Sequence, residues 1–222
     1  MRVRRKKHLP ERLAAVSDVL LSGEQEDRNH KTAIAKKDYI DLKKLFGNSN
    51  PLYLEIGCGK GKFAVEYAKR HKGINLLAVE KEANVIVSAC ELCKREGIQN
   101  LKFLKCSAEY IERYIREKSV AGIFLNFSCP FPKNTYASHR LTSARFLEIY
   151  KRILADGARI EQKTDNMHFF EFSIEQFSAA GFILENISLD LHNSGYEDNI
   201  VTEYESRFAA EGLPIYRLEA HL

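Results

Sequence analysis

The pattern of apolar and polar positions divides the chain into an irregular start and a long alternation of strands and helices. Short apolar runs bounded by glycine or polar residues are typical of buried strands, and apolar residues spaced three and four apart are typical of amphipathic helices. The predicted strands cover 52–56, 74–80, 101–106, 123–127, 158–162, 182–189 and 215–220. The predicted helices cover 61–71, 83–96, 108–117, 143–154, 167–180 and 202–210.

This alternation predicts an α/β fold with a mostly parallel seven-stranded sheet and helices on both faces. No long helix separates the last two strands, so we expect an antiparallel strand at the C-terminal end of the sheet. We divide the chain into a basic arm with a helical extension at 1–50 and a ligand-binding domain at 51–222. Ligands of such sheets bind outside the carboxyl ends of the strands, so the loops there should carry the function.

The loop after the first predicted strand is rich in glycine, with Gly57, Gly59 and Gly61 at alternate positions. Glycine lets the chain turn tightly and lets a ligand lie against bare backbone. A dinucleotide fingerprint would need its third glycine where this chain has Lys62. The spacing therefore favours a smaller ligand that contains a nucleoside.

Polar residues stand at the ends of the following strands as well. Glu80 closes the second strand, where a carboxylate can accept both hydroxyls of a ribose. Glu55 closes the first strand, and two roles stay open for it: orienting the glycine loop or meeting an ammonium group of the ligand. Ser107 and Ala108 follow the third strand, where an adenine edge would lie, and Asn126 near the end of the fourth is a further candidate for ligand binding.

The composition is that of an ordinary globular protein, with 45% hydrophobic and 29% charged residues among 222. No apolar run is long enough for a transmembrane helix, so we expect no membrane association and a cytoplasmic location. The five cysteines are scattered, and Cys90 and Cys93 form a C-x-x-C pair with no second pair to complete a zinc site. We therefore predict neither a disulfide framework nor a metal.

Positive charge is concentrated at the start of the chain. The net charge is +4, and residues 1–12 hold six basic residues against Glu11 alone. A basic arm on a nearly neutral body is typical of a partner with a phosphate backbone, although a solvated terminus has the same composition. On the first interpretation, Arg4, Arg5 and Lys6 contact RNA.

Several separate motifs carry a specific resemblance. They are Asn126-Phe127-Ser128-Cys129-Pro130-Phe131-Pro132-Lys133, His139-Arg140-Leu141-Thr142, Lys163-Thr164-Asp165-Asn166 and Thr202-Glu203-Tyr204-Glu205. In this order and spacing the chain resembles the bacterial tRNA (guanine-N7-)-methyltransferases, which are class I S-adenosylmethionine-dependent methyltransferases. The resemblance implies a Rossmann-like fold, S-adenosyl-L-methionine as cofactor, tRNA as partner and methyl transfer to N7 of a guanine.

The resemblance also implies roles for individual residues. Glu55 and Glu80 would bind the cofactor, and the loop that ends at Arg140 would contact RNA. The residues that would bind the tRNA guanine are Lys133, Asp165, Thr202, Glu203, Tyr204 and Glu205.

One departure from the family concerns the catalytic position. This chain has Cys129 where the family has an aspartate, and Phe131 where it has a tryptophan. Guanine N7 carries a lone pair and no hydrogen, so methylation there needs no general base. We expect an active enzyme with Asp165 as its main acidic group and Cys129 beside it. The alternative is a non-catalytic tRNA-binding protein inactivated at Cys129; a methyltransferase for another RNA position or a small molecule is a third reading.

Structural roles compete with the proposed ones. Asp165 or Asn166 fits the N-cap of the helix that follows, and Thr202 with Glu205 fits a capping box, T-x-x-E. In the latter case Glu203 would still be able to face the substrate. Phe131, Tyr136 and Tyr196 are candidates to stack on an extruded base. The sequence leaves open whether the chain is a monomer or a homodimer.

Overall fold

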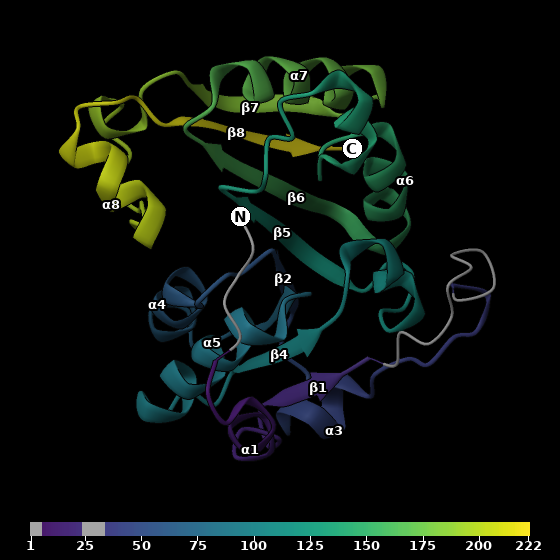
Figure 1. The fold of residues 1–222 in the computed structure, drawn as a ribbon. Coiled ribbons are helices and arrows are strands. Elements are labelled where there is room, and N and C mark those ends of the chain that lie inside the picture. The colour runs from purple at the N-terminus through teal and green to yellow at the C-terminus, as the bar shows by residue number, and fades with distance from the viewer. Residues whose placement is uncertain (1–5, 24–33) are drawn as a thin grey trace. The chain divides into compact units, whose positions relative to one another are not determined.

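The computed structural model describes residues 6–23 and 34–222, apart from the side chains of Glu203, Arg207, Ala209 and Ala210. The chain forms two compact units, Met1–Arg116 and Glu117–Leu222. Each unit contributes four of the described strands (Figure 1). The predicted functional boundary near residue 50 is a different division and stays a prediction. Arg4 and Arg5, which we expected to contact RNA, lie outside the described residues.

The strands of the first unit are all parallel and follow the order β1-β4-β3-β2. Their bounds are Leu20–Ser22 for β1, Leu52–Ile56 for β2, Asn75–Glu80 for β3 and Leu101–Lys105 for β4. The sequence analysis missed β1, because three residues are too short for any periodic signal. Tertiary pairing creates this strand: Leu20 lies opposite Phe103, and both side chains are buried.

Helices α4 (Lys62–Arg70) and α5 (Ala83–Arg95) pack on these strands and on each other. The arm contributes α1 (Leu9–Ala14), which packs against α5. Two short elements complete the unit, α3 (Leu42–Phe46) and the 3-10 helix η1 (Ala108–Arg113). The prediction of a longer helix at 108–117 was wrong: the 3-10 helix ends at Arg113, and a stretch of turns leads from there to β5, which begins at Val120.

In the second unit, β5 (Val120–Asn126) pairs in parallel with β6 (Leu154–Thr164). Strand β8 (Tyr216–His221) is antiparallel to β6, and β7 (Ile183–Ser188) is antiparallel to β8. The prediction of an antiparallel C-terminal strand is thus confirmed. The fifth predicted strand began at 158, but β6 begins at Leu154 and bulges before Arg159 pairs with Gly122.

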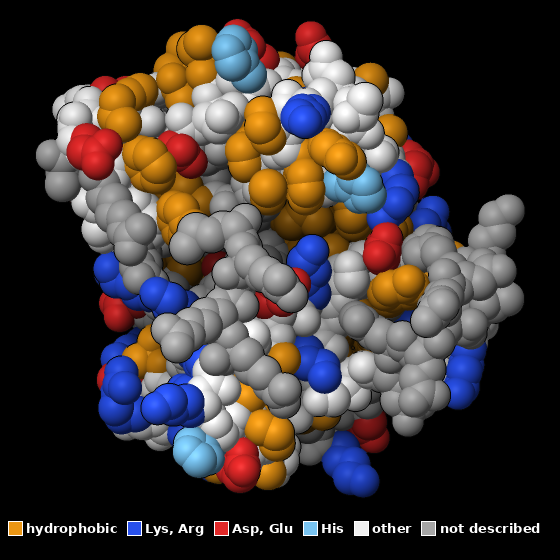
Figure 2. Space-filling view, in the orientation of Figure 1, with side chains coloured by type: hydrophobic (Ala, Val, Ile, Leu, Met, Phe, Trp, Pro, Cys, Tyr) orange, Lys and Arg blue, Asp and Glu red, His pale blue; other side chains and the backbone are white. Residues whose placement is uncertain are grey.

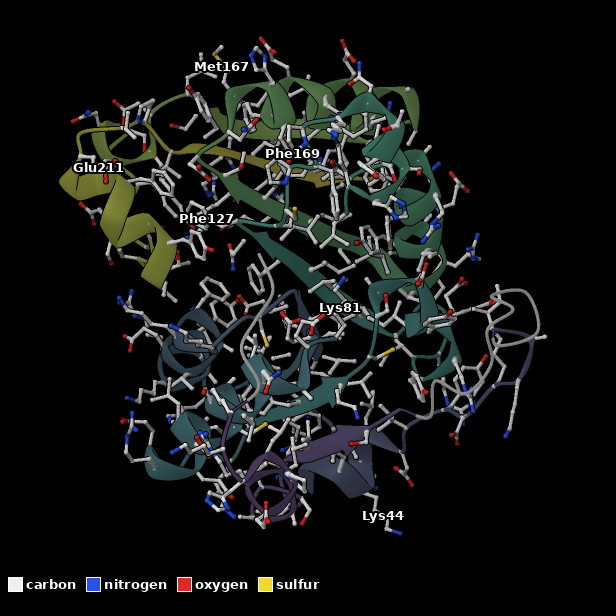
Figure 3. All side chains as sticks on the ribbon, in the orientation of Figure 1. Lys44, Lys81, Phe127, Met167, Phe169 and Glu211 are labelled. Atoms are coloured by element: carbon white, nitrogen blue, oxygen red, sulfur yellow. The ribbon has the colours of Figure 1, made fainter. Side chains whose placement is uncertain are left out.

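The helices of the second unit are α6 (Ala144–Ile153), α7 (Met167–Ala179) and α8 (Glu203–Ala210), with 3-10 turns η2 (Asn134–His139) and η3 (Leu191–Asn193). Helix α7 packs on β6, β7 and β8 through buried aromatic residues that include Phe169, labelled in Figure 3. Helix α8 lies beyond the carboxyl end of β6 (Figure 1). Among the described helices, none has the length and hydropathy needed to cross a bilayer.

Candidate cofactor and guanine sites

The glycine loop of the first unit leaves open space above its backbone. Gly57 and Gly59 adopt positive φ values of 83° and 57°, and a Cβ placed on either would meet nothing within 4 Å. The N–H groups of Gly57 and Cys58 both donate to the carbonyl of Val79, at 2.8 and 3.1 Å, which holds the loop against the end of β3. The loop therefore presents bare, fixed backbone, which suits a ligand that lies flat against it.

Gly61 has a different function in the same loop. Its φ is 80°, and a Cβ there would come within 2.7 Å of the Ala89 Cβ on α5. Glycine at this position lets the start of α4 approach α5 closely. The sequence analysis assigned all three glycines to the ligand, whereas the contacts of Gly61 indicate helix packing.

Two carboxylates lie at the same edge of this unit. The Glu55 side chain is buried, with 2% of its surface exposed, and Glu80 is partly buried at the end of β3. Burial raises the pKa of Glu80, and hydrogen bonds from the backbone N–H groups of Glu82, Gly59 and Lys81 partly offset this rise. The Glu80 Oε1 atom accepts the bond from Glu82 N at 3.0 Å. The carboxylate is therefore held in place by backbone beside the open glycine loop, as the ribose of a nucleoside requires.

The third strand end and the arm adjoin this region of the first unit. Ser107 and Ala108 follow β4 directly and are half-buried, and the Ser107 hydroxyl lies 3.4 Å from a Glu109 carboxylate oxygen. Lys6 contacts α5: its backbone N–H donates to Asn84 at 3.0 Å, and its ammonium group bonds the Ser88 hydroxyl. The predicted contact of Lys6 with RNA stays a prediction, and in the described structure this lysine is a point of attachment between the arm and α5.

The Pro-rich loop of the second unit begins where β5 ends. Asn126 ends the strand and is buried; Phe127 then turns the chain with a φ of 50° and donates its N–H to the carbonyl of Lys163 at 2.8 Å. Arg140 holds the far side of the loop, donating to the carbonyls of Pro130 and Phe131 at 2.9 and 3.0 Å.

Arg140 thus has a position that the sequence analysis did not anticipate. Only 8% of the residue is exposed, and its guanidinium lies 4.3 Å from the centre of the Phe172 ring. A guanidinium so committed is poorly available to phosphates. Its observed contacts support the Pro-rich loop, and its expected contact with RNA stays a prediction.

In the turn after β6, one residue caps the next helix, and the residue before it has a carboxylate with no described hydrogen-bond partner. The Asn166 side chain accepts from the N–H of Phe169 at 2.8 Å and caps α7. Asp165 is half-buried, and its carboxylate accepts no hydrogen bond from any residue that the structure describes. The capping alternative for Asp165 is therefore resolved in favour of Asn166, and Asp165 is left available to a ligand.

At the start of α8, by contrast, the acidic residue is itself part of the helix cap. Thr202 and Glu205 form the capping box: the N–H of Glu205 donates to the Thr202 hydroxyl at 3.0 Å, and the N–H of Thr202 donates to the Glu205 carboxylate at 3.3 Å. The same carboxylate pairs with the Lys163 ammonium at 3.1 Å, and these two side chains are 0% and 1% exposed. Asn199 also donates to it. In the described structure Thr202 and Glu205 therefore bond internally, and their expected contact with guanine stays a prediction.

Comparison with known proteins identifies the family. A model of the family described as "Putative methyltransferase" matches residues 49–218. A tRNA (guanine-N(7)-)-methyltransferase of Geobacillus kaustophilus is 40% identical over 99% of this chain and 96% of its own length. One of Listeria monocytogenes is 46% identical over 79% of this chain and 82% of its own length. The chain belongs to the tRNA (guanine-N(7)-)-methyltransferase family.

Solved structures agree on the fold of this family member. An antibiotic-related methyltransferase superimposes with a TM-score of 0.62 over 90% of this chain and 97% of its own, at 16% identity. A 16S rRNA methyltransferase gives 0.59 over 82% of this chain and 94% of its own, also at 16% identity. At such identity the likeness shows the fold alone, which is the predicted Rossmann-like class I methyltransferase fold.

Three further motif residues of the second unit are exposed. Lys133 and Cys129 are exposed on the Pro-rich loop, and Tyr204 is 59% exposed on the first turn of α8. The side chain of Glu203 lies outside the described residues, so its predicted contact with guanine stays a prediction. Together with Asp165, the exposed residues provide a cation, a thiol, an aromatic ring and a carboxylate for a ligand.

The sequence analysis missed two residues that organise this region. Lys163 stood in a quoted motif but received no role, although its ammonium donates to Asn199, Ile200 and Glu205. A lysine near the end of an otherwise buried strand was the available signal. Phe127 was also missed, and its ring lies near that of Tyr204. No sequence signal indicated the positive φ of Phe127.

Proposed function

We propose that this chain transfers a methyl group from S-adenosyl-L-methionine to N7 of a guanine in tRNA. The observation that carries the proposal is the near full-length similarity to relatives that bear this activity in their name. The free carboxylate of Asp165, which lies in one of the motifs shared with that family, supports it from the structure.

The first unit is suited to the cofactor. Gly57 and Gly59 leave room for a flat ligand above their backbone, and Glu80 is fixed where it can accept from the ribose hydroxyls. Glu55, Ser107 and Ala108 are further candidates on strand ends of this unit, and Asn126 is a candidate in the second unit. When bound, S-adenosylmethionine supplies the methyl group, and the electron pair of its S–CH₃ bond stays on sulfur while positive charge appears on the purine.

The second unit is suited to the guanine. Guanine presents N1–H and N2–H₂ donors, and the Asp165 carboxylate has free acceptor positions for them. Such bonds would fix the orientation of N7, and orientation supplies much of the rate when no proton has to be removed. The carboxylate would also stabilise the positive charge that grows on the base. Lys133, exposed on the adjoining loop, would contact the nucleotide as a cation.

Cys129 would contribute little to this chemistry directly. A thiol is a weak donor and does not replace a carboxylate. Cys129 is exposed, so the position is accessible to the substrate. Because N7 needs no base, we expect Cys129 to lower the rate relative to an aspartate rather than to abolish it.

Contacts with the rest of the tRNA would be electrostatic. Figure 2 shows Lys and Arg side chains gathered over α4 and its surroundings, where Lys60, Lys62, Arg70 and Lys72 are exposed. The basic arm adds further positive charge. Each phosphate neutralised releases counterions, so tRNA affinity should fall steeply as salt concentration rises.

The direct test combines methylation with mapping. Purified protein is incubated with labelled S-adenosylmethionine and an unmodified tRNA transcript, and the RNA is then cleaved chemically at N7-methylated guanine. Scission at one guanine is the expected result. Absence of scission, with tRNA still bound, would contradict the proposal; if Cys129→Asp then restored scission, the chain would be a binding protein disabled at that residue.

A further inference from the structure

The geometry of Phe127 and Tyr204 carries an inference that rests on the proposed function and extends it. Phe127 follows the end of β5, and Tyr204 lies in the first turn of α8. Figure 3 labels Phe127 on the side of this unit where α8 lies. We propose that these two rings stack on the two faces of the acceptor guanine and form its aromatic clamp.

The spacing of the rings fits a base between them. Their centroids are 6.4 Å apart and their planes differ by 17°. Stacked bases rise by about 3.4 Å per step, so a ring, a base and a second ring span about 6.8 Å. A base between them therefore requires the two rings to face each other squarely and to move apart by a few tenths of an ångström. Tyr204 is 59% exposed and Phe127 is half-buried, so both rings are accessible from solvent.

The backbone of Phe127 is a second sign of function. Its φ of 50° lies in the left-handed region, which a bulky residue rarely adopts. Unfavourable conformations of this kind persist where surrounding structure imposes them, and they gather at binding sites. Here the hydrogen bond from Phe127 N to the Lys163 carbonyl, at 2.8 Å, helps to impose the conformation and directs the ring away from the strand.

Lys163 links the two halves of the clamp. Its carbonyl holds Phe127, while its ammonium group pairs with Glu205, one residue beyond Tyr204. The capping box between Thr202 and Glu205 fixes the same turn of α8. The backbone segments that carry the two rings are therefore both bonded to one buried residue, Lys163.

The clamp suits the chemistry of the product as well as that of the substrate. Aromatic faces carry negative electrostatic potential and attract cations placed above them. A guanine methylated at N7 is cationic, so the rings of Phe127 and Tyr204 favour it over neutral guanine.

Fluorescence offers a measurement of the clamp that does not depend on turnover. The chain contains no tryptophan, so Tyr204→Trp introduces a single tryptophan, which can be excited selectively at wavelengths where tyrosine does not absorb. We expect N7-methylguanosine 5′-monophosphate to quench it saturably and more strongly than guanosine 5′-monophosphate. Adding Phe127→Leu should weaken the quenching by at least about tenfold, since stacking on one aromatic ring is typically worth that much. The matched control is Tyr39→Trp in the first unit, for which we expect only the weak linear quenching of collisions.

Methylation of tRNA gives the second measurement. Tyr204→Leu should lower kcat/KM by about 10- to 100-fold, whereas Tyr204→Phe, which keeps the ring, should stay within about threefold of the wild type. Tyr39→Leu is the control for loss of an aromatic residue elsewhere. Tyr204 is 59% exposed, so we expect its replacement to change the free energy of unfolding little, and the test remains decisive if Phe127→Leu proves unstable.

The outcomes separate this inference from the proposed function. Equal quenching at positions 204 and 39, or full activity of Tyr204→Leu, would overturn the clamp while leaving the methyltransferase in place. If the wild type methylated no tRNA, the proposed function would fail, and the fluorescence titration would still decide whether the rings hold a guanine.

Discussion

Two acidic turns of the second unit make an instructive pair, the one after β6 and the one that begins α8. Both carry a carboxylate expected to bind guanine, and both start a helix whose N–H groups need a cap. After β6, the cap is Asn166, and the neighbouring Asp165 keeps its carboxylate free. At α8, Glu205 itself joins the capping box and pairs with Lys163. Similar local sequence therefore leaves the carboxylate of Asp165 without a partner among the described residues and gives Glu205 a structural role.

The comparison teaches that the partners of a carboxylate decide its role. A carboxylate has acceptor capacity for several hydrogen bonds, and a buried one must use it. Glu205, which is fully buried, accepts from Lys163, Asn199 and the backbone of Thr202. Asp165 uses none of its capacity within the described residues. Substitution of Glu205 should therefore lower the stability of the protein, whereas substitution of Asp165 should lower its activity.

The largest effect is expected on stability, from Glu205→Ala. The Lys163 ammonium group would stay buried without its carboxylate, and breaking a buried pair in this way costs about 3–5 kcal/mol in the free energy of unfolding. Urea denaturation measures the loss, with the exposed Glu211→Ala as control. A loss below about 1 kcal/mol would show that Glu205 is dispensable to the fold. The neutral pair Lys163→Met with Glu205→Gln should recover much of the stability.

The next effect is on activity, from Asp165→Ala. A hydrogen bond to a charged group contributes about 1.5–3 kcal/mol, so kcat/KM for tRNA should fall by about 10- to 150-fold. Because Asp165 has no described partner, the free energy of unfolding should change by less than about 0.5 kcal/mol. Asp156→Ala, which removes an exposed carboxylate of the same unit, is the control. Near-normal turnover of Asp165→Ala would remove it from the list of guanine contacts.

A third carboxylate, that of Glu80, extends the comparison, because it is partly buried and is also proposed to bind a ligand. Burial raises its pKa, so the folded chain holds a proton at higher pH than the unfolded chain does. Its contribution to stability is most favourable in acid and declines as pH rises through the raised pKa. Glu80→Gln should therefore be no less stable than the wild type at neutral pH.

The same substitution should weaken cofactor binding by about tenfold, since a neutral amide replaces a charged acceptor. Calorimetric titration with S-adenosylhomocysteine measures this. Wild-type affinity should fall as pH is lowered through the raised pKa of Glu80, whereas Glu80→Gln should lack that component. Parallel pH profiles for the two proteins would argue against Glu80 as a contact.

The smallest effect is expected from Asn166→Ala. Loss of an N-cap costs about 0.5–2 kcal/mol in the free energy of unfolding, and Asn166→Asp, which can still accept from Phe169, should restore it. Thermal denaturation compares the two variants. Methyl transfer by the folded fraction should remain close to the wild type. A loss of turnover as large as that of Asp165→Ala would instead place Asn166 at the substrate.

The sequence by itself determined the order of elements and the fold class, because strands and helices with one buried face leave periodic apolar patterns. It also located the glycine loop and Glu80, since positive φ values and strand ends have local signatures. It did not reveal β1, whose three residues become a strand only by pairing with β4. The 3-10 form of η1 was equally hidden, because the spacing of apolar residues over so short a segment does not distinguish a 3-10 helix from an α-helix.

Only the tertiary structure decided which motif residues face a ligand. Arg140, Thr202 and Glu205 share their motifs with exposed residues, yet their side chains are buried and bonded internally. Hydrogen-bond partners far apart in the sequence, such as Lys163 and Glu205, are brought together by the sheet and not by local pattern. A sequence names the groups capable of chemistry, and the folded chain determines which of them it has already used to hold itself together.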